Sequence, residues 1–348
     1  MTSALRLFAL ILLLALLPPV MAGAAPRGET AGHGLQERIK AAKAGDAATQ
    51  FALGLDYRNG NGLPKDAVQA YKWIHQAALG NLADAQYLAG VMDQHGEGTP
   101  RKPADAADWF RKAAKQGHLP ATLALADMLR RGEGVAIDQT GAAKLYRAAA
   151  DRNDLDSQLV LGELYARGEG VAKNLNDAAV WYRRAAQGGS AEGRTRLALL
   201  LLDGDPARRA AHRPSRNSRE AVFWLRLAAE QNHAPALFTL GMASWGGIIL
   251  PFDRFEALSL VRLAADQGYA PALRQMAWFY RSGKVVAKDP QRAAMYLDLA
   301  EQLGAPPGRL ARDALFRAER EALSRELPSA QLQTAKKRAQ DWLQLRGL

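Results

Sequence analysis

Small and apolar residues recur along most of this chain with a 36-residue period. Each period contains two helical patterns, a glycine between them, an aromatic or leucine residue and a pair of alanines. Helical spacing at a fixed period of this length predicts a protein built from repeated helix pairs. The recurring positions include Gly60, Gly96, Gly132, Gly168 and Gly204, the aromatic residues Trp73, Trp109 and Trp181, and the alanine pairs at 77–78, 113–114, 149–150 and 185–186.

The period divides the chain into seven units, and the fifth unit carries an insertion. After residue 186 the frame slips by seven residues, so that the alanine pair recurs at 228–229 and again at 264–265. The additional residues fall at about 206–219. The predicted units are 47–82, 83–118, 119–154, 155–190, 191–233, 234–269 and 270–305.

Each unit is predicted to hold two helices joined by a glycine-containing loop. Gly132 and Gly168 end first helices, where the left-handed conformation favours glycine, so we expect positive φ at both. An Asp or Asn precedes the second helix and is expected to cap its free amides. These capping residues are Asp66, Asp138, Asn174, Asp253 and Asp289. The alanine pairs allow the helices to approach closely.

Helices are also predicted on both sides of the seven units. Residues 35–46 match only the second half of a unit, which predicts an N-terminal half-repeat cap. Pro306-Pro307 ends the last unit. Residues 306–348 contain two helical patterns, at 309–325 and from about 330 to 345, and Ser329 is the expected cap of the second. We expect a C-terminal helical cap that buries Leu310, Leu315, Phe316 and Leu323. The alternative is that these helices bind a partner.

The N-terminus has the pattern of an export signal. A positive start is followed by an uninterrupted apolar run from Leu7 to Leu17, then by Pro18-Pro19 and the small residues Ala22-Gly23-Ala24. We predict a signal peptide at 1–24, a mature N-terminus at Ala25, a flexible linker at 25–34 and a periplasmic location. The alternative is an uncleaved anchor, although 11 apolar residues fall short of the roughly 20 that span a bilayer.

Composition narrows the possible functions. A hydrophobic fraction of 48% with 23% charged residues excludes a disordered chain. The absence of cysteine excludes disulfides, thiol nucleophiles and iron–sulfur clusters. The net charge of +11 comes from basic residues that we expect to be spread along the chain, and the predicted compartment argues against nucleic acid.

No pattern typical of a catalytic or metal site occurs, so we predict no catalytic residue, no metal and no cofactor. The pairs Asp127 with Arg131 and Glu163 with Arg167 have i,i+4 spacing and predict ion pairs on a helix surface. His118 and His233 share one repeat position with unrelated residue types, which indicates a tolerant surface turn.

Two short motifs carry a family resemblance. The segments Gly-Glu-Gly-Val at 132–135 and 168–171, and Trp-Phe-Arg-Lys-Ala-Ala at 109–114, resemble the Sel1-like repeat family, which is related to tetratricopeptide repeats. The resemblance covers about residues 35–305. It implies an all-α fold, an α/α solenoid superhelix of seven helix pairs, and a role as an interaction scaffold that is often exported in bacteria. A cysteine-rich branch linked to β-lactams does not apply to a chain without cysteine.

Two features suggest where a partner binds. The register of related solenoids places arginines and aromatics on one face of the first helices, and the sixth unit has apolar residues in the loop where other units have Glu and Gly. The predicted partner-binding residues are Arg130, Arg131, Arg167, Trp245, Ile248, Ile249, Phe252, Trp278 and Arg281. Phe51, Tyr87 and Phe238 are expected in the core. The insertion contributes a predicted anionic contact at Arg208, Arg209, Arg213 and Arg216.

These observations predict an exported, non-catalytic protein–protein interaction scaffold of the bacterial cell envelope. Its partner is expected to be another envelope protein or a peptide segment. The alternative is an envelope protein that binds peptidoglycan or an acidic polysaccharide, and an enzyme is the third hypothesis. A membrane contact is expected only through the signal sequence, if that sequence stays uncleaved.

Overall fold

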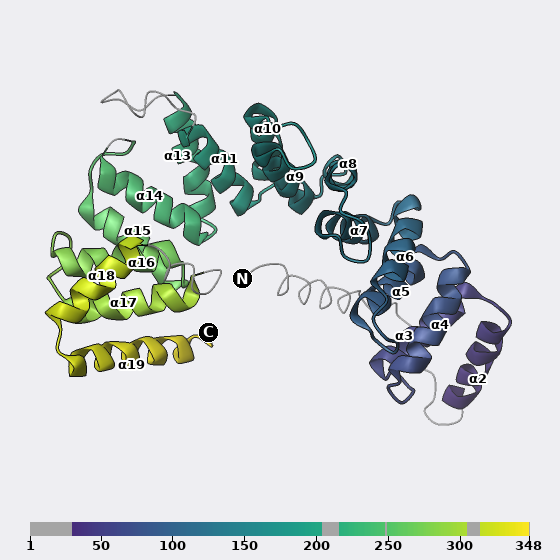
Figure 1. Ribbon diagram of the computed structural model, residues 1–348. Coiled ribbons are helices and arrows are strands. Elements are labelled where there is room, and N and C mark those ends of the chain that lie inside the picture. Colours follow the sequence, from purple (N-terminus) through teal and green to yellow (C-terminus); the bar gives the residue numbers. More distant parts are fainter. Residues whose placement is uncertain (1–29, 204–215, 248, 305–313, 348) are drawn as a thin grey trace. The chain divides into compact units, whose positions relative to one another are not determined.

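The computed structural model describes residues 30–203, 216–247, 249–304 and 314–347, and within these ranges all regular secondary structure is helical. The chain divides between Trp181 and Tyr182 into two compact units, which we call the N-terminal unit and the C-terminal unit. Figure 1 shows the order of the helices along the chain. Within the described ranges, no helix is long and apolar enough to cross a membrane. The predicted signal peptide, and residues 25–29 of the predicted linker, lie outside these ranges.

The N-terminal unit holds one preliminary helix followed by helix pairs. Helices that follow one another along the chain pack together, as expected of a repeat protein. Its helices are α2 (Thr30–Lys43), α3 (Ala47–Asn59), α4 (Ala67–Leu79), α5 (Ala83–His95), α6 (Pro103–Lys115), α7 (Leu119–Arg131), α8 (Gln139–Ala150), α9 (Leu155–Arg167) and the first part of α10 (Leu175–Gln187).

The C-terminal unit continues this pattern and ends in two further helices. Its helices after α10 are α11 (Ala191–Asp203), α13 (Arg216–Ala229), α14 (Ala234–Gly246), α15 (Arg254–Asp266), α16 (Ala270–Ser282), α17 (Pro290–Leu303), α18 (Ala314–Glu326) and α19 (Ser329–Leu345). The helices α18 and α19 pack on α17 and share its hydrophobic core, as a C-terminal cap should.

The predicted helix ends are confirmed. Gly132 and Gly168 follow α7 and α9 with φ values of 71° and 77°, and each donates its amide to the helix carbonyl four residues earlier. This is the left-handed helix end that glycine favours. The five predicted Asp and Asn caps each accept at least one amide of the helix that follows. The alanine pairs form the contacts between helices; both alanines are buried at 77–78, 149–150, 185–186 and 264–265.

Several boundaries and burial predictions differ from the structure. The first helix covers Thr30–Lys43 instead of 35–46, because it continues over Gly34 and ends before Gly45, whose φ is 99°. In α18, Phe316 and Leu323 are buried as expected, whereas Leu315 is 70% exposed because it lies on the solvent side of the helix. Residue 310 lies outside the described ranges. Pro328 takes the capping position that we predicted for Ser329.

In three of the four loops of the N-terminal unit, the second glycine has a separate packing role, and Gly62 of the first loop has no atom within 4 Å of an added Cβ. A Cβ atom at Gly98, Gly134 or Gly170 would lie 2.0–2.3 Å from backbone atoms at the start of the preceding repeat's second helix. No side chain fits at such distances, so glycine is required there for close approach between repeats. The equivalent residues in the C-terminal unit are Ile249 and Val285, which pack against its hydrophobic cores.

The positive charge belongs to one of the two units and is not spread along the chain as we predicted. Residues 30–181 contain 18 Lys and Arg against 18 Asp and Glu, and therefore carry no net charge. Residues 182–348 contain 26 Lys and Arg against 16 Asp and Glu, a net charge of +10. The N-terminal unit is therefore balanced, and the C-terminal unit attracts anions.

Candidate functional site

Three aromatic side chains of the C-terminal unit form a cluster that we call the aromatic patch: Trp245, Phe252 and Trp278. Trp245 lies at the end of α14, Trp278 lies on α16, and the loop after α14 supplies Phe252. The ring of Trp245 lies 5.6 Å from each of the other two rings. Beneath them Phe279 is fully buried, 5.5 Å from Trp245 and 5.7 Å from Trp278.

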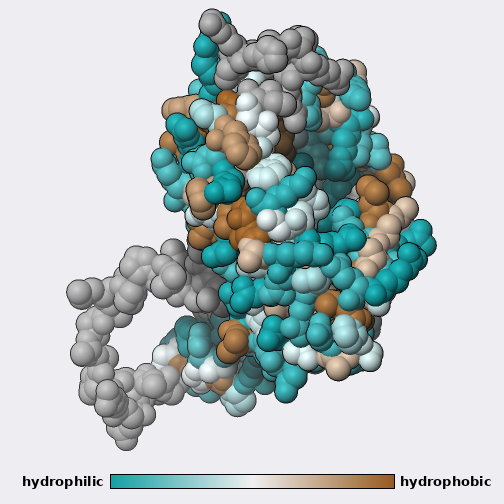
Figure 2. All heavy atoms as spheres, turned by 90° about the vertical axis from the view of Figure 1, so that its left-hand side faces the viewer, coloured by the Kyte–Doolittle hydropathy of each residue, from teal (hydrophilic) through white to brown (hydrophobic). Residues whose placement is uncertain are grey.

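The aromatic patch reaches the surface without losing its anchorage to the core. Phe252 is 61% exposed, whereas Trp245 and Trp278 are partly buried and pack against the core formed by α14 to α19. Figure 2, which views the side of the molecule that carries α14 to α19, shows a mostly hydrophilic surface with separate hydrophobic patches. Rigidly seated aromatic side chains with one exposed member are typical of protein-binding sites.

Two cationic residues lie close to the aromatic patch in the sequence and on the same repeat. Lys284 is exposed and places its Nζ 5.7 Å from the centre of the Trp278 ring, within the range of a cation–π contact. Arg281 follows Trp278 by one helical turn. Among the described residues, neither side chain has an ion-pair partner within 4.0 Å, whereas Arg274 on the same helix pairs with Glu319.

The N-terminal unit uses the equivalent positions differently. Trp245 has the repeat position of Arg58, and Arg58 donates two hydrogen bonds, of 2.8 and 2.9 Å, to the carboxylate of Glu97 in the next repeat. The following pair of repeats is joined in the same way by Gln94 and Glu133. The polar contact that joins repeats in the N-terminal unit is therefore replaced by aromatic rings in the C-terminal unit.

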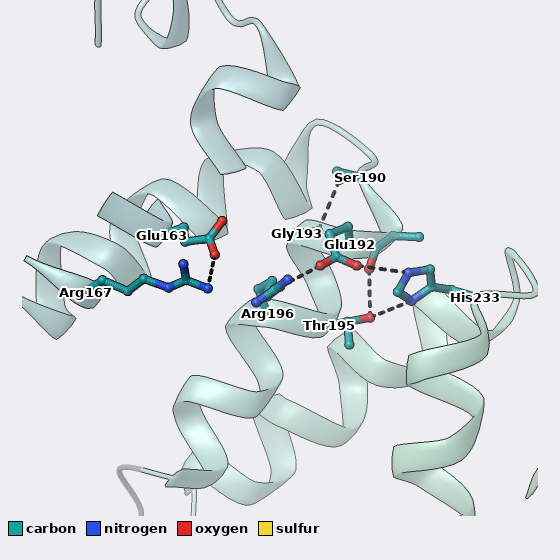
Figure 3. Close-up of polar contacts among 9 residues, drawn as sticks. Glu163, Arg167, Ser190, Glu192, Gly193, Thr195, Arg196 and His233 are labelled. Carbon is teal, nitrogen blue, oxygen red and sulfur yellow. Dashed lines mark hydrogen bonds and ion pairs between the residues drawn. The ribbon is translucent and has the colours of Figure 1, made fainter. Parts of the chain in front are cut away.

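The predicted arginines of the N-terminal unit are engaged within their own chain. Arg130 and Arg131 both lie within 3.7 Å of the Asp127 carboxylate. Arg167 pairs with Glu163 at 2.5 Å (Figure 3) and, on its other side, with Glu169 at 3.6 Å. The two predicted i,i+4 ion pairs are thus confirmed. The structure gives no contact between Arg167, on the fourth repeat, and Arg130 and Arg131, on the third.

The remaining predicted site residues are divided between the core, the surface and the undescribed segments. Ile249 packs against the core of α11 to α14, so this residue is structural and does not belong to an exposed docking loop. Arg216 is exposed at the first position of α13. The undescribed segments contain Ile248, Arg208, Arg209 and Arg213. Phe51, Tyr87 and Phe238 are partly buried against cores, close to the prediction.

A polar cluster that the sequence analysis missed joins the start of α11 to His233, the last residue of the fifth repeat and the N-cap of α14 (Figure 3). The Glu192 carboxylate pairs with Arg196 at 2.5 Å and with Nε2 of His233 at 3.2 Å, and Nδ1 of His233 lies 2.9 Å from the Thr195 hydroxyl. The hydrogen bond from His233 lowers the pKa of Glu192 from 4.5 to about 2, because it favours the ionised form. The cluster therefore holds an ionised carboxylate between the two ends of the fifth repeat.

The repeat register could have revealed this cluster. Asp84 and His118 in the N-terminal unit form the same kind of pair, at 3.2 Å, from equivalent repeat positions. Our interpretation of the histidine position as a tolerant surface turn was wrong. The side chains of His118 and His233 are only 15% and 20% exposed, because each is covered where two repeats meet.

The order Thr195, His233 and Glu192 resembles a catalytic triad, but its geometry does not fit one. Thr195 is 2% exposed, and its hydroxyl donates to the Ala191 carbonyl oxygen at 2.8 Å. A nucleophile must reach its substrate and pass its proton to the histidine. The described residues also contain no group of three or more His, Asp or Glu side chains that could hold a metal ion.

Comparison with known families now assigns the fold. The family model for the Sel1 repeat matches seven consecutive segments, 47–82, 83–118, 119–154, 155–190, 191–233, 234–269 and 270–304. This chain belongs to the Sel1 repeat family. The first six segments have the bounds that the 36-residue period predicts. Sel1 repeat proteins generally act as scaffolds for protein–protein interactions and are typically non-catalytic.

Solved structures agree with this assignment. The chain is similar to a Sel1 repeat protein from Oxalobacter formigenes, with 26% identity, a TM-score of 0.60, and coverage of 74% of this chain and 99% of that chain. It also matches c5321, a protective antigen of uropathogenic Escherichia coli with an SLR fold, with 25% identity, a TM-score of 0.41, and coverage of 88% of this chain and 78% of that chain. Among curated proteins, none matches the sequence. The likeness to the Oxalobacter protein supports an α/α solenoid of Sel1 repeats.

Proposed function

We propose that this Sel1 repeat protein is an exported, non-catalytic scaffold of the cell envelope that binds a segment of another protein at the aromatic patch. The observation that carries the proposal is the exposure of Phe252 beside Trp245 and Trp278. Four other described repeats place Lys65, Arg101, Lys173 or Lys288 at the position of Phe252, against the helix-ending glycine, and the third repeat places the exposed Ile137 there. Phe252 differs from these residues in that its ring joins two tryptophans at the surface and keeps most of its own area exposed.

Binding energy in protein interfaces concentrates in a few anchored aromatic residues. Burial of an exposed phenylalanine contributes about 1.5–3 kcal/mol. Trp245 and Trp278 are already fixed by contact with buried Phe279, so a partner that docks against them loses little side-chain entropy on their account. The aromatic patch therefore has the composition and the rigidity of an interface centre.

Export is supported by the sequence before Ala25. The apolar run, the two prolines and the small residues that end at Ala24 follow the order of a secretory signal. Cell fractionation and N-terminal sequencing test this part of the proposal. We expect recovery from the periplasm with Ala25 as the first residue. A membrane-bound protein that keeps residues 1–24 would contradict it.

The binding test uses two matched phenylalanines of the C-terminal unit. Phe252 and Phe223 are 61% and 54% exposed, and each ring contacts one tryptophan, Trp245 and Trp224 respectively. Partners captured from envelope extract by the wild type are identified, purified and titrated against Phe252→Ala and Phe223→Ala. We expect Phe252→Ala to weaken binding by about 10-fold or more and Phe223→Ala to leave it unchanged. Equal effects of both variants would overturn the assignment of the patch.

A second candidate function is the binding of an acidic envelope polysaccharide. The net charge of +10 on residues 182–348, together with the predicted anionic contact at Arg208, Arg209, Arg213 and Arg216, favours it. Such binding rests on charge, so its affinity should fall steeply with ionic strength. Binding centred on the aromatic patch should depend on salt much less.

A further inference from the structure

The loop residue that follows the helix-ending glycine is acidic in three repeats of the N-terminal unit and basic in the seventh repeat. The acidic residues are Glu97, Glu133 and Glu169, and the first repeat has Asn61 at this position. Each of these carboxylates pairs with an arginine of its own unit: Arg58, Arg101 and Arg167, at distances of 2.8, 3.0 and 3.6 Å. The N-terminal unit therefore satisfies this row of charges internally.

The seventh repeat carries Lys284 at the same position. The Glu97 and Glu133 loops receive Arg58 and Gln94 from the preceding repeat, but the residue at the corresponding position before Lys284 is Trp245. Trp245 has no charge that could pair with the ammonium group of Lys284, and that group lies over the ring of Trp278.

Arg281 adds a second cation on the same repeat. Arg281 interacts with the charge of Glu326, and Glu326 already forms an ion pair with Lys288 at 2.7 Å. Lys284 thus lies beside the aromatic patch and Arg281 lies one helical turn after Trp278, and neither has a carboxylate within 4.0 Å among the described residues, in a unit of net charge +10. An anion that approaches this unit is attracted over a distance of about 8–10 Å at moderate ionic strength.

We infer that the segment bound at the aromatic patch is acidic: one apolar side chain docks against Trp245, Phe252 and Trp278, and an adjacent Asp or Glu pairs with Lys284 and Arg281. This inference rests on the proposed function. The bound carboxylate would form an ion pair with Lys284 and Arg281, as Glu97 and Glu133 do with arginines within the N-terminal unit. Hydrogen bonds between ionised groups are the stronger ones, so the acidic residue adds specificity to the apolar contact.

The arrangement of the rings favours a peptide side chain over a sugar. Trp245 is inclined by 74° to Trp278 and by 55° to Phe252, so the three rings form a corner and not a flat platform. A single aliphatic or aromatic side chain fills a corner, whereas a pyranose ring stacks on an extended flat face. The experiment must therefore distinguish a peptide ligand from an acidic polysaccharide.

The test uses a displayed library of random dodecapeptides, selected on the full-length protein without its signal sequence. Three variants are selected in parallel: Lys284→Glu combined with Arg281→Glu, Phe252→Ala, and Lys173→Glu. The last is a matched control, because Lys173 is an exposed loop lysine of the N-terminal unit and its replacement is the same kind of charge reversal. Circular dichroism melts verify that each variant folds, and Lys284→Glu supplies the residue type that the N-terminal unit tolerates at this position.

We expect peptides selected on the wild type to combine an apolar residue with Asp or Glu within two positions. A synthetic peptide of the selected sequence should bind the Lys284→Glu, Arg281→Glu variant at least 10-fold more weakly, with a flatter salt dependence, and the Lys173→Glu control as tightly as the wild type. Phe252→Ala should lose affinity equally at low and high salt.

Each other outcome has a definite meaning. Neutral or basic peptides that require Phe252 would overturn the acidic segment and leave the proposed function standing, as would acidic peptides indifferent to Lys284 and Arg281. No enrichment on the wild type would overturn the proposed function itself. Alginate, titrated separately as a pure acidic polysaccharide, should bind weakly. Tight alginate binding that depends on Lys284 and Arg281 would replace the peptide with a polysaccharide.

Discussion

The two units of this Sel1 repeat protein are both built from helix pairs, but they differ in the side chains at equivalent repeat positions. The N-terminal unit joins successive repeats through Arg58 with Glu97 and Gln94 with Glu133, and its charges sum to zero. In the C-terminal unit the same positions hold Trp245 and Lys284, and the net charge is +10. Polar side chains that satisfy one another stabilise a repeat array; side chains left unmatched are available to a partner.

A second difference concerns the loops. Gly98, Gly134 and Gly170 let the loop backbone of the N-terminal unit lie against the preceding repeat, whereas Ile249 and Val285 place side chains against the cores of the C-terminal unit. These loops of the N-terminal unit have no room for a side chain at this position, whereas the loops of the C-terminal unit need an apolar side chain there. The same loop position therefore responds to substitution in opposite ways in the two units, and the predictions below test this.

The largest effect is expected from Gly170→Ala. The added Cβ would lie 2.1 Å from the Gln139 carbonyl oxygen at a φ of +70°. Strain and overpacking therefore combine to lower the free energy of unfolding by about 3 kcal/mol. Gly117→Ala is the matched control, since its φ is +81° and no atom lies within 4 Å of the added carbon. It should cost about 1 kcal/mol. Chemical denaturation checks both, and equal losses would show that φ alone matters.

The reverse substitution in the other unit should also destabilise. Val285→Gly removes a side chain packed against the core of the C-terminal unit. The lost packing and the added backbone freedom together cost about 2 kcal/mol. If the two loops were built alike, this change would restore the glycine of the N-terminal unit and would be neutral or stabilising. The midpoint of denaturation distinguishes the two outcomes.

The Glu192 carboxylate should make the stability of the C-terminal unit depend on pH in acid. The folded-state pKa of Glu192, about 2, lies below its ordinary 4.5. Its stabilisation is therefore complete above the ordinary pKa and is lost as the pH falls toward the lowered one. With allowance for solvent screening, the loss is about 1 kcal/mol. Glu192→Gln should remove this pH dependence in acid denaturation.

The smallest effect concerns His118 in the N-terminal unit. Burial lowers the pKa of His118 below its ordinary 6.5, although Asp84 acts in the opposite direction. Its Nδ1 accepts the amide of Ala121, so protonation removes a helix cap. The stabilisation is complete above the ordinary pKa and is lost as the pH falls through the lowered value. We expect His118→Asn, which keeps a capping side chain, to flatten the pH dependence of hydrogen exchange in α7 by less than about 1 kcal/mol. An unchanged pH profile would contradict the capping role.

Much of the fold followed from the sequence because repeats make local signals additive. A single Gly or Ala-Ala pair says little, but seven copies in register predict the helix pairs, the positive φ at Gly132 and Gly168, and the caps at Asp66 and Asp289. The ends of the array were predicted less well. There the period gives no second copy for comparison, and the first helix extends to Thr30.

The candidate site followed from the sequence only in part. Trp245 and Trp278 were predicted as binding residues from the register of the first helices, and Phe252 because it departs from the repeat. The structure brings the three together. Arg130, Arg131 and Arg167 were chosen by residue type, and their own helices supply the carboxylates that pair with them. The contact between Glu192 and His233 was missed because the insertion hides its 41-residue spacing, compared with 34 for Asp84 and His118.

The sequence by itself determined the repeat, its helix pairs and the residues that end and cap them, because these depend on backbone conformation within a few residues. Only the tertiary structure decided which charges are paired between repeats and which glycines touch the preceding repeat. Those properties depend on distances between residues about one repeat apart, and a helical period places such residues near one another without saying which of their side chains meet.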